Sequence, residues 1–230
     1  MKVIILAAGR GSRLGFPDLP KPLTPLANGK TILGAQLDNL SAFVELDDVI
    51  VVVGYHKEKI MDACAHLAFV YNPNFASENT SKSLLRALRK VDDDVLWING
   101  DVVFHPSVLQ QTIDERRTSM VVNVGGVGEE EVKYVTDGHG TIIQVSKQVD
   151  RPEGEALGIN FVSKGDVIAL CAALQECQDN DYFEKGIELC IQRGMQVRCV
   201  QVDAGLCTEV DFPEDLVRAN TLVQQWQQKY

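Results

Sequence analysis

The sequence predicts an α/β fold: a doubly wound, mostly parallel sheet followed by a small β-hairpin excursion. Two observations indicate it. Along the first two-thirds of the chain, short apolar runs alternate with amphipathic segments, and several runs are apolar without alternation, as parallel strands covered on both faces require. After residue 125 the pattern changes to short polar-apolar alternations around the turn sequence Asp137-Gly138-His139-Gly140.

Each predicted element follows from its local pattern. Apolar runs predict strands at residues 3–6, 49–53, 68–71, 95–98 and 120–124. The amphipathic segments between them predict helices at residues 31–44, 57–66, 81–91 and 105–116. After a hairpin at 131–136 and 141–147, we expect a strand, two helices, a strand and a closing helix at residues 156–163, 164–177, 181–193, 196–202 and 212–227. No linker divides the chain, so we expect one domain over residues 1–230, with the β excursion at 125–165 beside the functional site.

The composition excludes several classes of protein. Acidic residues number 32 against 22 Lys and Arg, so the formal net charge is −10, and the chain lacks the excess positive charge that binds nucleic acids or anionic membranes. No apolar run approaches the ~20 residues that cross a bilayer. We therefore expect no nucleic-acid partner and no membrane insertion, and any bound phosphate has to be held by local charges. The composition leaves a homo-oligomer open.

The cysteines and the N-terminus indicate a cytoplasmic protein. The apolar run at the N-terminus stops at Ala8, before Gly9 and Arg10, which favours a buried strand over a signal peptide. The cysteines form no CxxC pair and have no histidine at zinc-ligand spacing, so we expect them to be reduced core residues. They are Cys64, Cys171, Cys177, Cys190, Cys199 and Cys207.

A glycine-rich loop with basic residues follows the first strand. The sequence LAAGRGSRL spans residues 6–14, and Lys21 follows it within a Pro-Lys-Pro triplet. Small residues let backbone amides approach an anion closely, and an amide-lined turn can cradle phosphate oxygens. Arg10, Arg13 and Lys21 add positive charge to this segment of an otherwise acidic chain. The segment therefore predicts a phosphate site.

Two well-known phosphate loops fit this segment badly. A Walker loop needs GxxxxGK followed by Ser or Thr, and no Lys follows the second glycine here. A dinucleotide loop needs GxGxxG and an acidic residue about twenty positions further along. Leu14 stands near where the third glycine would be, and residues 28–34 contain no carboxylate. The sequence therefore disfavours a Walker NTPase and an NAD-dependent dehydrogenase.

The loop resembles the signature of the sugar-phosphate and alcohol-phosphate nucleotidyltransferases, LAAGxGxRL followed closely by PKP. The resemblance implies their Rossmann-like fold and their reaction, in which a nucleoside triphosphate and a small phosphorylated acceptor give a nucleotide-activated metabolite and pyrophosphate. It further implies that Arg13 contacts the triphosphate and that Lys21 bridges the nucleotide and acceptor phosphates. The remaining loop residues would bind the nucleotide: Leu6, Ala7, Ala8, Gly9, Arg10, Gly11 and Ser12.

Two acidic segments complete the expected site. Asp101 follows a central strand, at the carboxyl end where open α/β sheets bind ligands, although a lone Asp there is commonly a turn or cap residue. Glu209 and Asp211 lie two residues apart in an extended segment, so their side chains share a face. In the family that the chain resembles, carboxylates at such positions hold Mg²⁺, which prefers hard oxygen ligands. We expect Asp101, Glu209 and Asp211 to bind Mg²⁺, and Glu214 and Asp215 only to place negative charge at the start of the last helix.

The base and the acceptor are assigned through the same resemblance. Residues 78–88, ENTSKSLLRAL, resemble the family's base-recognition segment, with Ser83 and Asn79 facing the base; these residue types are equally favoured as helix caps, and both roles can coexist. Chain length and the hairpin place the resemblance among short cytidylyltransferases acting on phosphocholine, inositol phosphate or aminoethylphosphonate. Lys147 and Glu155 are the expected acceptor contacts. Three aromatic residues either face an alkylammonium group or lie in the core: Tyr71, Phe75 and Phe161.

The expected chemistry needs neither a general base nor a covalent nucleophile, because the acceptor phosphate is already an anion at neutral pH. Catalysis then rests on aligning two mutually repelling phosphates and neutralising charge as pyrophosphate leaves. We expect Arg13, Lys21, Asp101 and Asp211 to be catalytic, with Mg²⁺ as cofactor and CTP as nucleotide. A uridylyl-, guanylyl- or thymidylyltransferase acting on a sugar 1-phosphate stays open, as does a non-catalytic nucleotide-binding regulatory domain. A glycosyltransferase is disfavoured, because apolar residues follow Asp101 where a DxD-type pair would stand.

Overall fold

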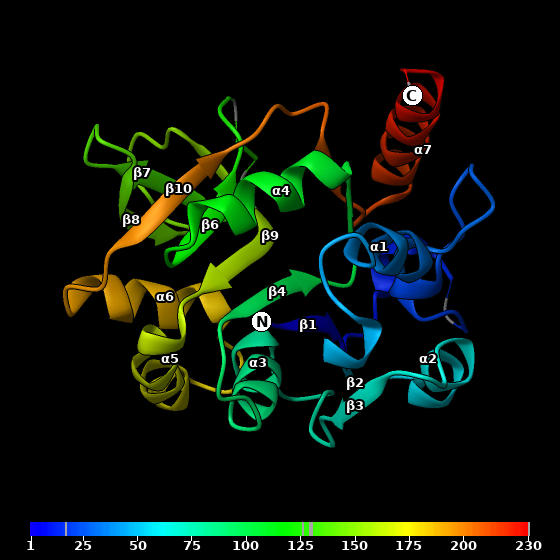
Figure 1. Ribbon diagram of the computed structural model, residues 1–230, viewed down its shortest axis with the longest axis horizontal. Helices are drawn as coiled ribbons and strands as arrows, with labels where there is room; N and C mark the ends of the chain where they lie inside the picture. The colour runs from blue at the N-terminus through cyan, green and yellow to red at the C-terminus, as the bar shows by residue number, and fades with distance from the viewer. Residues whose placement is uncertain (17, 126, 129–130, 230) are drawn as a thin grey trace.

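The computed structural model describes residues 1–16, 18–125, 127–128 and 131–229. Within this part of the chain, a nine-stranded sheet and a separate two-stranded ribbon are flanked by seven α-helices and three short 3-10 helices. The strand order of the large sheet is β3-β2-β1-β4-β9-β6-β10-β8-β7 (Figure 1). Its strands are β1 (Lys2–Ala7), β2 (Val49–Val53), β3 (Ala68–Tyr71), β4 (Val95–Asn99), β6 (Ser119–Val122), β7 (Lys133–Thr136), β8 (Thr141–Ser146), β9 (Gly154–Val162) and β10 (Val197–Gln201).

The helices lie close to their predicted positions, and the predicted α/β class is confirmed. Their ends differ from the predicted ends by a few residues, chiefly because the amphipathic pattern continues into the flanking turns. The α-helices are α1 (Ile32–Leu40), α2 (Lys57–Ala63), α3 (Thr80–Leu88), α4 (Pro106–Glu115), α5 (Lys164–Glu176), α6 (Phe183–Gln192) and α7 (Pro213–Lys229). The 3-10 helices are η1 (Ser12–Leu14), η2 (Lys21–Leu23) and η3 (Leu46–Asp48).

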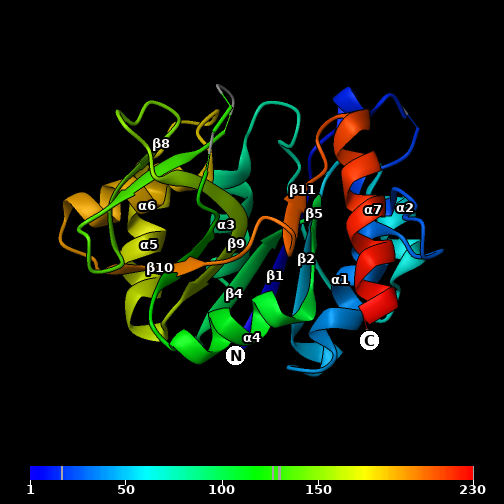
Figure 2. The same cartoon turned by 90° about the horizontal axis from the view of Figure 1, so that it is seen from above.

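The first half of the chain builds the parallel part of the sheet. Strand β1 pairs in parallel with β2 and β4, and β2 pairs in parallel with β3. Alternate side chains of β1 enter two hydrophobic cores, one shared with α3, α5 and α6 and the other with α1, α2 and α4. Figures 1 and 2 show these two groups of helices on opposite faces of the sheet. Coverage on both faces explains why these strands are apolar without alternation.

The second half of the chain adds antiparallel strands. Strand β9 lies between β4 and β6 and runs antiparallel to both, so the sheet is mixed on this side. The predicted hairpin is confirmed as β7–β8, and the Oδ1 of Asp137 accepts the backbone N–H groups of His139 and Thr141 in its turn. Residues 126 and 129–130 of the expected excursion lie outside the described part of the chain.

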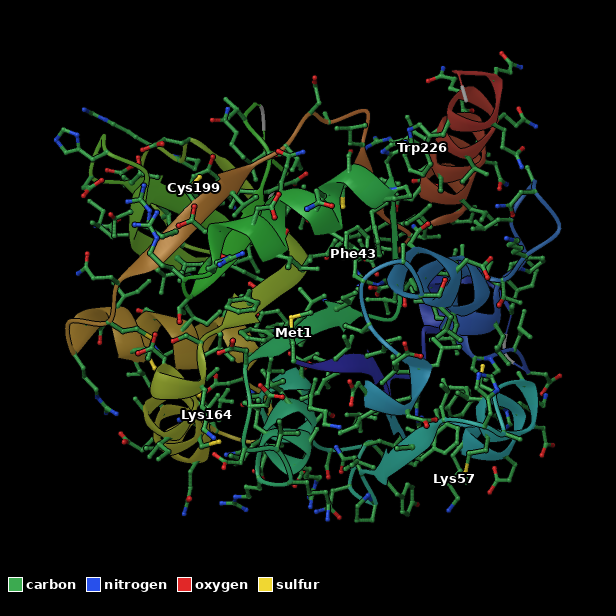
Figure 3. The ribbon with its side chains drawn as sticks, in the orientation of Figure 1. Met1, Phe43, Lys57, Lys164, Cys199 and Trp226 are labelled. Carbon is green, nitrogen blue, oxygen red and sulfur yellow. The ribbon has the colours of Figure 1, made fainter. Side chains whose placement is uncertain are left out.

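A small ribbon beside the sheet was not predicted. Strand β5 (Val102–Phe104) pairs antiparallel with β11 (Cys207–Glu209). Each has only three residues, too few for a periodic pattern. Figure 2 shows α7 packed beside this ribbon and α1, and the indole Nε1 of Trp226 on α7, labelled in Figure 3, donates to the Gly205 carbonyl at 3.0 Å. The ribbon therefore ties the last part of the chain to the segment after β4.

Most of the cysteines lie in the interior of the protein. All six cysteines are free thiols. Four of them are buried, namely Cys64, Cys177, Cys190 and Cys207. In the described ranges, no helix combines the length and the apolar character that crossing a membrane requires.

Candidate active site

A cavity of about 410 Å³ lies at the carboxyl ends of β1 and β4. Its walls come from the loop after β1, the turn after β4, the N-terminal ends of α3 and α6, the β7–β8 hairpin and the segment after β11. Open α/β sheets bind ligands at this edge, because successive crossover connections leave a crevice there. The cavity is therefore the candidate site on position alone.

The ammonium group of Lys21 is the centre of the cavity's charge cluster. Its Nζ lies 2.6 Å from Oδ2 of Asp101 and 2.6 Å from Oδ1 of Asp211. The side chain of Lys21 is only 10% exposed. Burial by itself lowers the pKa of this lysine, yet the two carboxylates outweigh burial and raise the pKa above its ordinary value. Lys21 is therefore a permanent cation at the floor of the cavity.

Gly11 allows the loop after β1 to pass directly over Lys21. Its φ is 57°, in the left-handed region, and a Cβ built there would lie 2.6 Å from the Cβ of Lys21. Only glycine meets both conditions without strain. The second glycine of the LAAGRGSRL loop thus sets a close approach between the loop and Lys21, which was not predicted from the sequence.

The β5–β11 ribbon brings the two acidic segments together. Glu209 is paired with Val102, directly after Asp101, and the backbone N–H of Val210 donates to the Asp101 carbonyl at 3.0 Å. Asp211 follows at the cavity wall, where Nη2 of Arg13 lies 3.0 Å from its Oδ1. The structure therefore places Arg13, Lys21, Asp101 and Asp211 in one contact network.

Glu209 lies against the same network. A Cβ on Gly158, whose φ is 64°, would lie 2.5 Å from Oε1 of Glu209, so the carboxylate fills the space beside this glycine. Burial first, and then the negative charges of Asp101 and Asp211, raise the pKa of Glu209 well above its ordinary value. A cation placed between these carboxylates would relieve the repulsion.

The donor set has the chemistry of a magnesium site that is completed by substrate. Oδ1 of Asp101 is buried and has no hydrogen-bond partner among the described residues. Within the same residues, no three His, Cys, Asp or Glu side chains are arranged to hold a metal by themselves. Mg²⁺ commonly binds through one or two carboxylates and takes its other oxygens from waters and substrate phosphates. Asp101, Glu209 and Asp211 are the residues that could hold it.

The predicted nucleotide residues line one end of the cavity. The run from Leu6 to Gly11 forms its wall, together with Asn79 and Ser83 at the start of α3. The Asn79 side chain caps this helix, since its Oδ1 accepts the Thr80 N–H at 2.8 Å. The side chain of Ser12 lies outside the described part of the structure. Helix capping thus coexists with a position on the cavity wall.

A second group of charged and aromatic cavity residues comes from the hairpin and from α6, whose start lies beside the start of α3. Nζ of Lys147 lies 4.5 Å from the centre of the Tyr182 ring. Glu184, in the first turn of α6, is only 8% exposed, and its Oε2 has no hydrogen-bond partner among the described residues. Burial raises the pKa of Glu184 to about 7. Glu131 also faces the cavity here.

One expected acceptor contact and two expected aromatic contacts lie elsewhere. The carboxylate of Glu155 accepts Nδ2 of Asn123 at 2.6 Å, and Glu155 is not among the described residues that line the cavity. Phe161 is buried in the core, and Tyr71 is exposed with Lys57 Nζ 3.8 Å from its ring centre. Of the three aromatic residues, Phe75 alone lines the cavity.

Several cavity residues were missed from the sequence. Tyr182 and Glu184 lie at the N-terminus of an amphipathic helix, and Glu131 precedes a short strand, so none belongs to a local motif. Phe212 was also missed, although it directly follows Asp211; its ring centre lies 5.0 Å from the guanidinium of Arg13. The position of this aromatic residue directly after two closely spaced acidic residues is the signal in the sequence that could have identified it.

The sequence of this chain matches a family of NTP transferases. Residues 3–131 match the family model of the MobA-like NTP transferase domain. The chain therefore belongs to this family, which agrees with the resemblance read from the N-terminal loop.

Curated relatives agree with this membership. CMP-5'-(3-aminopropyl)phosphonate synthase of Streptomyces rubellomurinus is 39% identical over 119 residues, which is 48% of this chain and 19% of that protein. UTP–glucose-1-phosphate uridylyltransferase AglF of Haloferax volcanii is 26% identical over 98% of this chain and 97% of its own length. The bifunctional protein GlmU of Methanococcus maripaludis is 28% identical over 96% of this chain, which spans 54% of that protein.

Two solved structures share the fold. The inositol-1-phosphate CTP transferase of T. maritima has a TM-score of 0.79 and 19% identity, covering 96% of this chain and 95% of its own. The CTP:phosphocholine cytidylyltransferase LicC of Streptococcus pneumoniae has a TM-score of 0.79 and 19% identity, covering 96% and 98%. The predicted Rossmann-like architecture is thereby confirmed.

Proposed function

We propose that this protein is a magnesium-dependent cytidylyltransferase that joins CTP to a small phosphate or phosphonate acceptor and releases pyrophosphate. One observation carries the proposal: the buried ammonium of Lys21 contacts Asp101 and Asp211 directly beneath the glycine-rich loop. A phosphoryl-transfer site needs such a cluster, because two polyanions have to be held together in line.

In the proposed reaction, an oxygen of the acceptor phosphate forms a bond to the α-phosphorus of the nucleotide. The bond from that phosphorus to the bridging oxygen breaks, and both electrons leave with pyrophosphate. Lys21 and Arg13 stabilise negative charge on the phosphates as the bonds change. The acceptor oxygen is already ionised, so the mechanism asks no side chain to remove a proton.

Mg²⁺ would be held by Asp101 and Asp211, with Glu209 beside them. When bound, it neutralises phosphate charge and fixes the nucleotide's geometry. The Asp101 oxygen without a hydrogen-bond partner supports this assignment. Lys21 would then exchange part of its contact with the carboxylates for contact with the phosphates, since its flexible stem can move its ammonium over a short distance.

The residues at the start of α6 that line the cavity support a substrate that bears an amino or alkylammonium group. The buried carboxylate of Glu184 and the ring of Tyr182 are the two kinds of group that stabilise such a cation. Two of the similar proteins act, by their names, on an aminopropylphosphonate and on phosphocholine. Lys147, which lies against the Tyr182 ring, would move toward the acceptor anion or stay as a wall of the pocket.

A sugar-1-phosphate uridylyltransferase is the second candidate. The similarity to the uridylyltransferase AglF over nearly the whole of both chains favours it. A sugar would need hydroxyl-binding partners, and Glu184 and Glu131 could also serve in that role.

Pyrophosphate release distinguishes the two candidates. Purified protein with Mg²⁺ should be assayed with CTP, UTP, GTP, dTTP and ATP against five acceptors: 2-aminoethylphosphonate, 3-aminopropylphosphonate, phosphocholine, inositol 1-phosphate and glucose 1-phosphate. We expect turnover with CTP and an amino-bearing acceptor. Turnover only with UTP and glucose 1-phosphate would replace the proposal by the second candidate, and tight nucleotide binding without turnover would indicate a regulatory domain.

A further inference from the structure

Behind Ser83 in the cavity wall lies a buried amide whose orientation is fixed by its neighbours. Asn72 is fully buried, and its Oδ1 accepts the backbone N–H of Asn74 at 2.9 Å. A backbone N–H can only donate, so the oxygen of the Asn72 amide has to face it. The Nδ2 of the same amide therefore points the other way, where it lies 3.1 Å from Oγ of Ser83.

This orientation determines what Ser83 can offer to a ligand. An amide nitrogen only donates, so Oγ of Ser83 is the acceptor of that bond and keeps its own proton. Ser83 is 5% exposed and lines the cavity, and no residue in the described part of the chain accepts this proton. Ser83 thus presents a buried hydrogen-bond donor to whatever fills this end of the cavity.

Glu78 presents the opposite polarity on the same wall. Its carboxylate accepts Nη2 of Arg86 at 2.8 Å and Nδ2 of Asn74 at 3.0 Å, and it lines the cavity. Burial raises the pKa of this group, but the hydrogen bonds and the charge of Arg86 outweigh burial and lower the pKa below its ordinary value. The carboxylate is ionised at neutral pH and can only accept. Asn74 donates its side-chain amide to Glu78 and its backbone N–H to Asn72, and Asn72 donates to Ser83, so Ser83 and Glu78 belong to one hydrogen-bond network.

We propose that Ser83 and Glu78 together select the base of the nucleotide: Ser83 donates to an acceptor atom of the ring, Glu78 accepts from an exocyclic amine, and Asn72 is the positioning residue. Cytosine has an exocyclic amine beside a ring acceptor. Uracil and thymine have a carbonyl oxygen beside a ring N–H, so each would leave both groups mispaired, as would guanine at its O6–N1 edge. This selection rests on the proposed function, and Ser83 and Glu78 are the groups that would restrict the enzyme to CTP.

Equilibrium binding tests the selection without requiring turnover. Calorimetry with CTP and UTP in the presence of Mg²⁺, without acceptor, gives the ratio of the two dissociation constants. Ser83→Ala should reduce the preference for CTP over UTP by about tenfold or more, because alanine has no hydroxyl donor to be left unpaired against the ring N–H of uracil. Ser83→Thr keeps the hydroxyl and should keep the ratio. Asn72→Asp keeps the acceptor for Asn74 but loses the donor to Ser83, so it should reduce the ratio as well.

A matched control and a modified ligand complete the test. Ser81 lies on α3 and is buried outside the cavity lining, so Ser81→Ala makes the same chemical change and should leave the ratio unchanged. A cytidine triphosphate analogue without the 4-amino group should bind the wild type at least about tenfold more weakly than CTP and should lose that disadvantage in Glu78→Gln.

Two results would overturn the inference. The first is an unchanged CTP-to-UTP ratio in folded Ser83→Ala, with folding checked by thermal melting. The second is ATP binding as tightly as CTP, since adenine has the same amine and ring acceptor and only the size of the site excludes it. Selective CTP binding without pyrophosphate release with any acceptor would contradict the proposed function and leave the base selection standing.

Discussion

The ammonium of Lys21 lies 2.6 Å from the carboxylate of Asp211, although 190 positions separate the two residues in the chain. The contact joins the loop that follows the first strand to the segment that precedes the last helix. Because a second carboxylate lies at the same distance from the ammonium, the lysine is held in one place before any ligand binds. Such preorganisation is what makes a charged group effective in catalysis.

Replacing Lys21 by alanine should reduce turnover by at least about 10²-fold, because the main fixed positive charge in the cavity is lost. The steady-state rate of pyrophosphate release measures the effect, and the melting temperature shows whether the variant folds. Lys30 forms an exposed ion pair with Asp38, away from the cavity, so Lys30→Ala is the control and should keep full activity. A folded Lys21→Ala protein with near-normal turnover would remove Lys21 from the mechanism.

Removing divalent cations should abolish the reaction, and Mg²⁺ should restore it. The reason is that Asp101 and Asp211 carry negative charge toward the triphosphate, and their contacts with Arg13 and Lys21 do not offset the charge of both carboxylates and the triphosphate. Pyrophosphate release after chelation with EDTA, followed by Mg²⁺ titration, measures this dependence. Asp101→Asn should shift the titration to higher Mg²⁺ concentration; full activity in EDTA would exclude a metal requirement.

Gly11→Ala should reduce activity more than its effect on stability explains. A Cβ there meets the Cβ of Lys21 at 2.6 Å and so displaces the lysine, in addition to the strain of φ 57°. Gly15 has φ 78° with nothing within 4 Å, so Gly15→Ala carries the backbone strain alone. Both variants should lose stability of about 1 kcal/mol in urea unfolding, whereas only Gly11→Ala should lose turnover. Equal activity losses would show that Lys21 does not depend on Gly11.

Glu184 should make the ligand-free protein less stable as the pH rises. A glutamate titrates near 4.5 when unfolded, whereas burial raises the pKa of folded Glu184 to about 7. Between these values the folded state holds a proton that the unfolded state has lost, so the free energy of unfolding falls with pH and levels off above about 7. Glu184→Gln should remove a difference on the order of 3 kcal/mol between pH 4.5 and pH 8.

Urea unfolding of Glu184→Gln at several pH values measures this slope. Glu188→Gln, a partly exposed change on the same helix, is the control and should preserve the wild-type slope. An identical slope in wild type and Glu184→Gln would mean that the carboxyl group is hydrated or paired in solution.

The part of the candidate site formed by the glycine-rich loop, Lys21 and Asp101 could be predicted, because each of these features is marked by its own short stretch of sequence. The LAAGRGSRL loop and the triplet around Lys21 carry glycine, proline and positive charge within one short segment, and Asp101 directly follows a strongly apolar strand. Their meeting point follows from the rule that parallel strands end at one edge of the sheet. The close packing of Gly11 on Lys21 could not be predicted, because it depends on how the loop and the Pro-Lys-Pro triplet fold against each other.

The acceptor-facing half could not be predicted because it depends on long-range pairing. The apolar sequence of strand β9 predicts a buried strand but not its direction. The antiparallel direction is set by pairing with β4 and β6. The helix end that carries Tyr182 and Glu184 is held beside the start of α3, where the N–H of Phe183 donates to Thr80 Oγ1 at 3.0 Å. Glu155 was misplaced for the same reason, since its side chain turned toward Asn123 on the neighbouring segment.

The short β5–β11 ribbon has a consequence for biosynthesis. Since β11 pairs with residues that follow β4, and Asp211 comes directly after β11, the cleft cannot assemble until the segment around β11 has been synthesised. A nascent chain stopped before β11 would hold its N-terminal loop and Lys21 without the opposing acids. Catalytic competence is thus withheld until translation has passed the acidic segment.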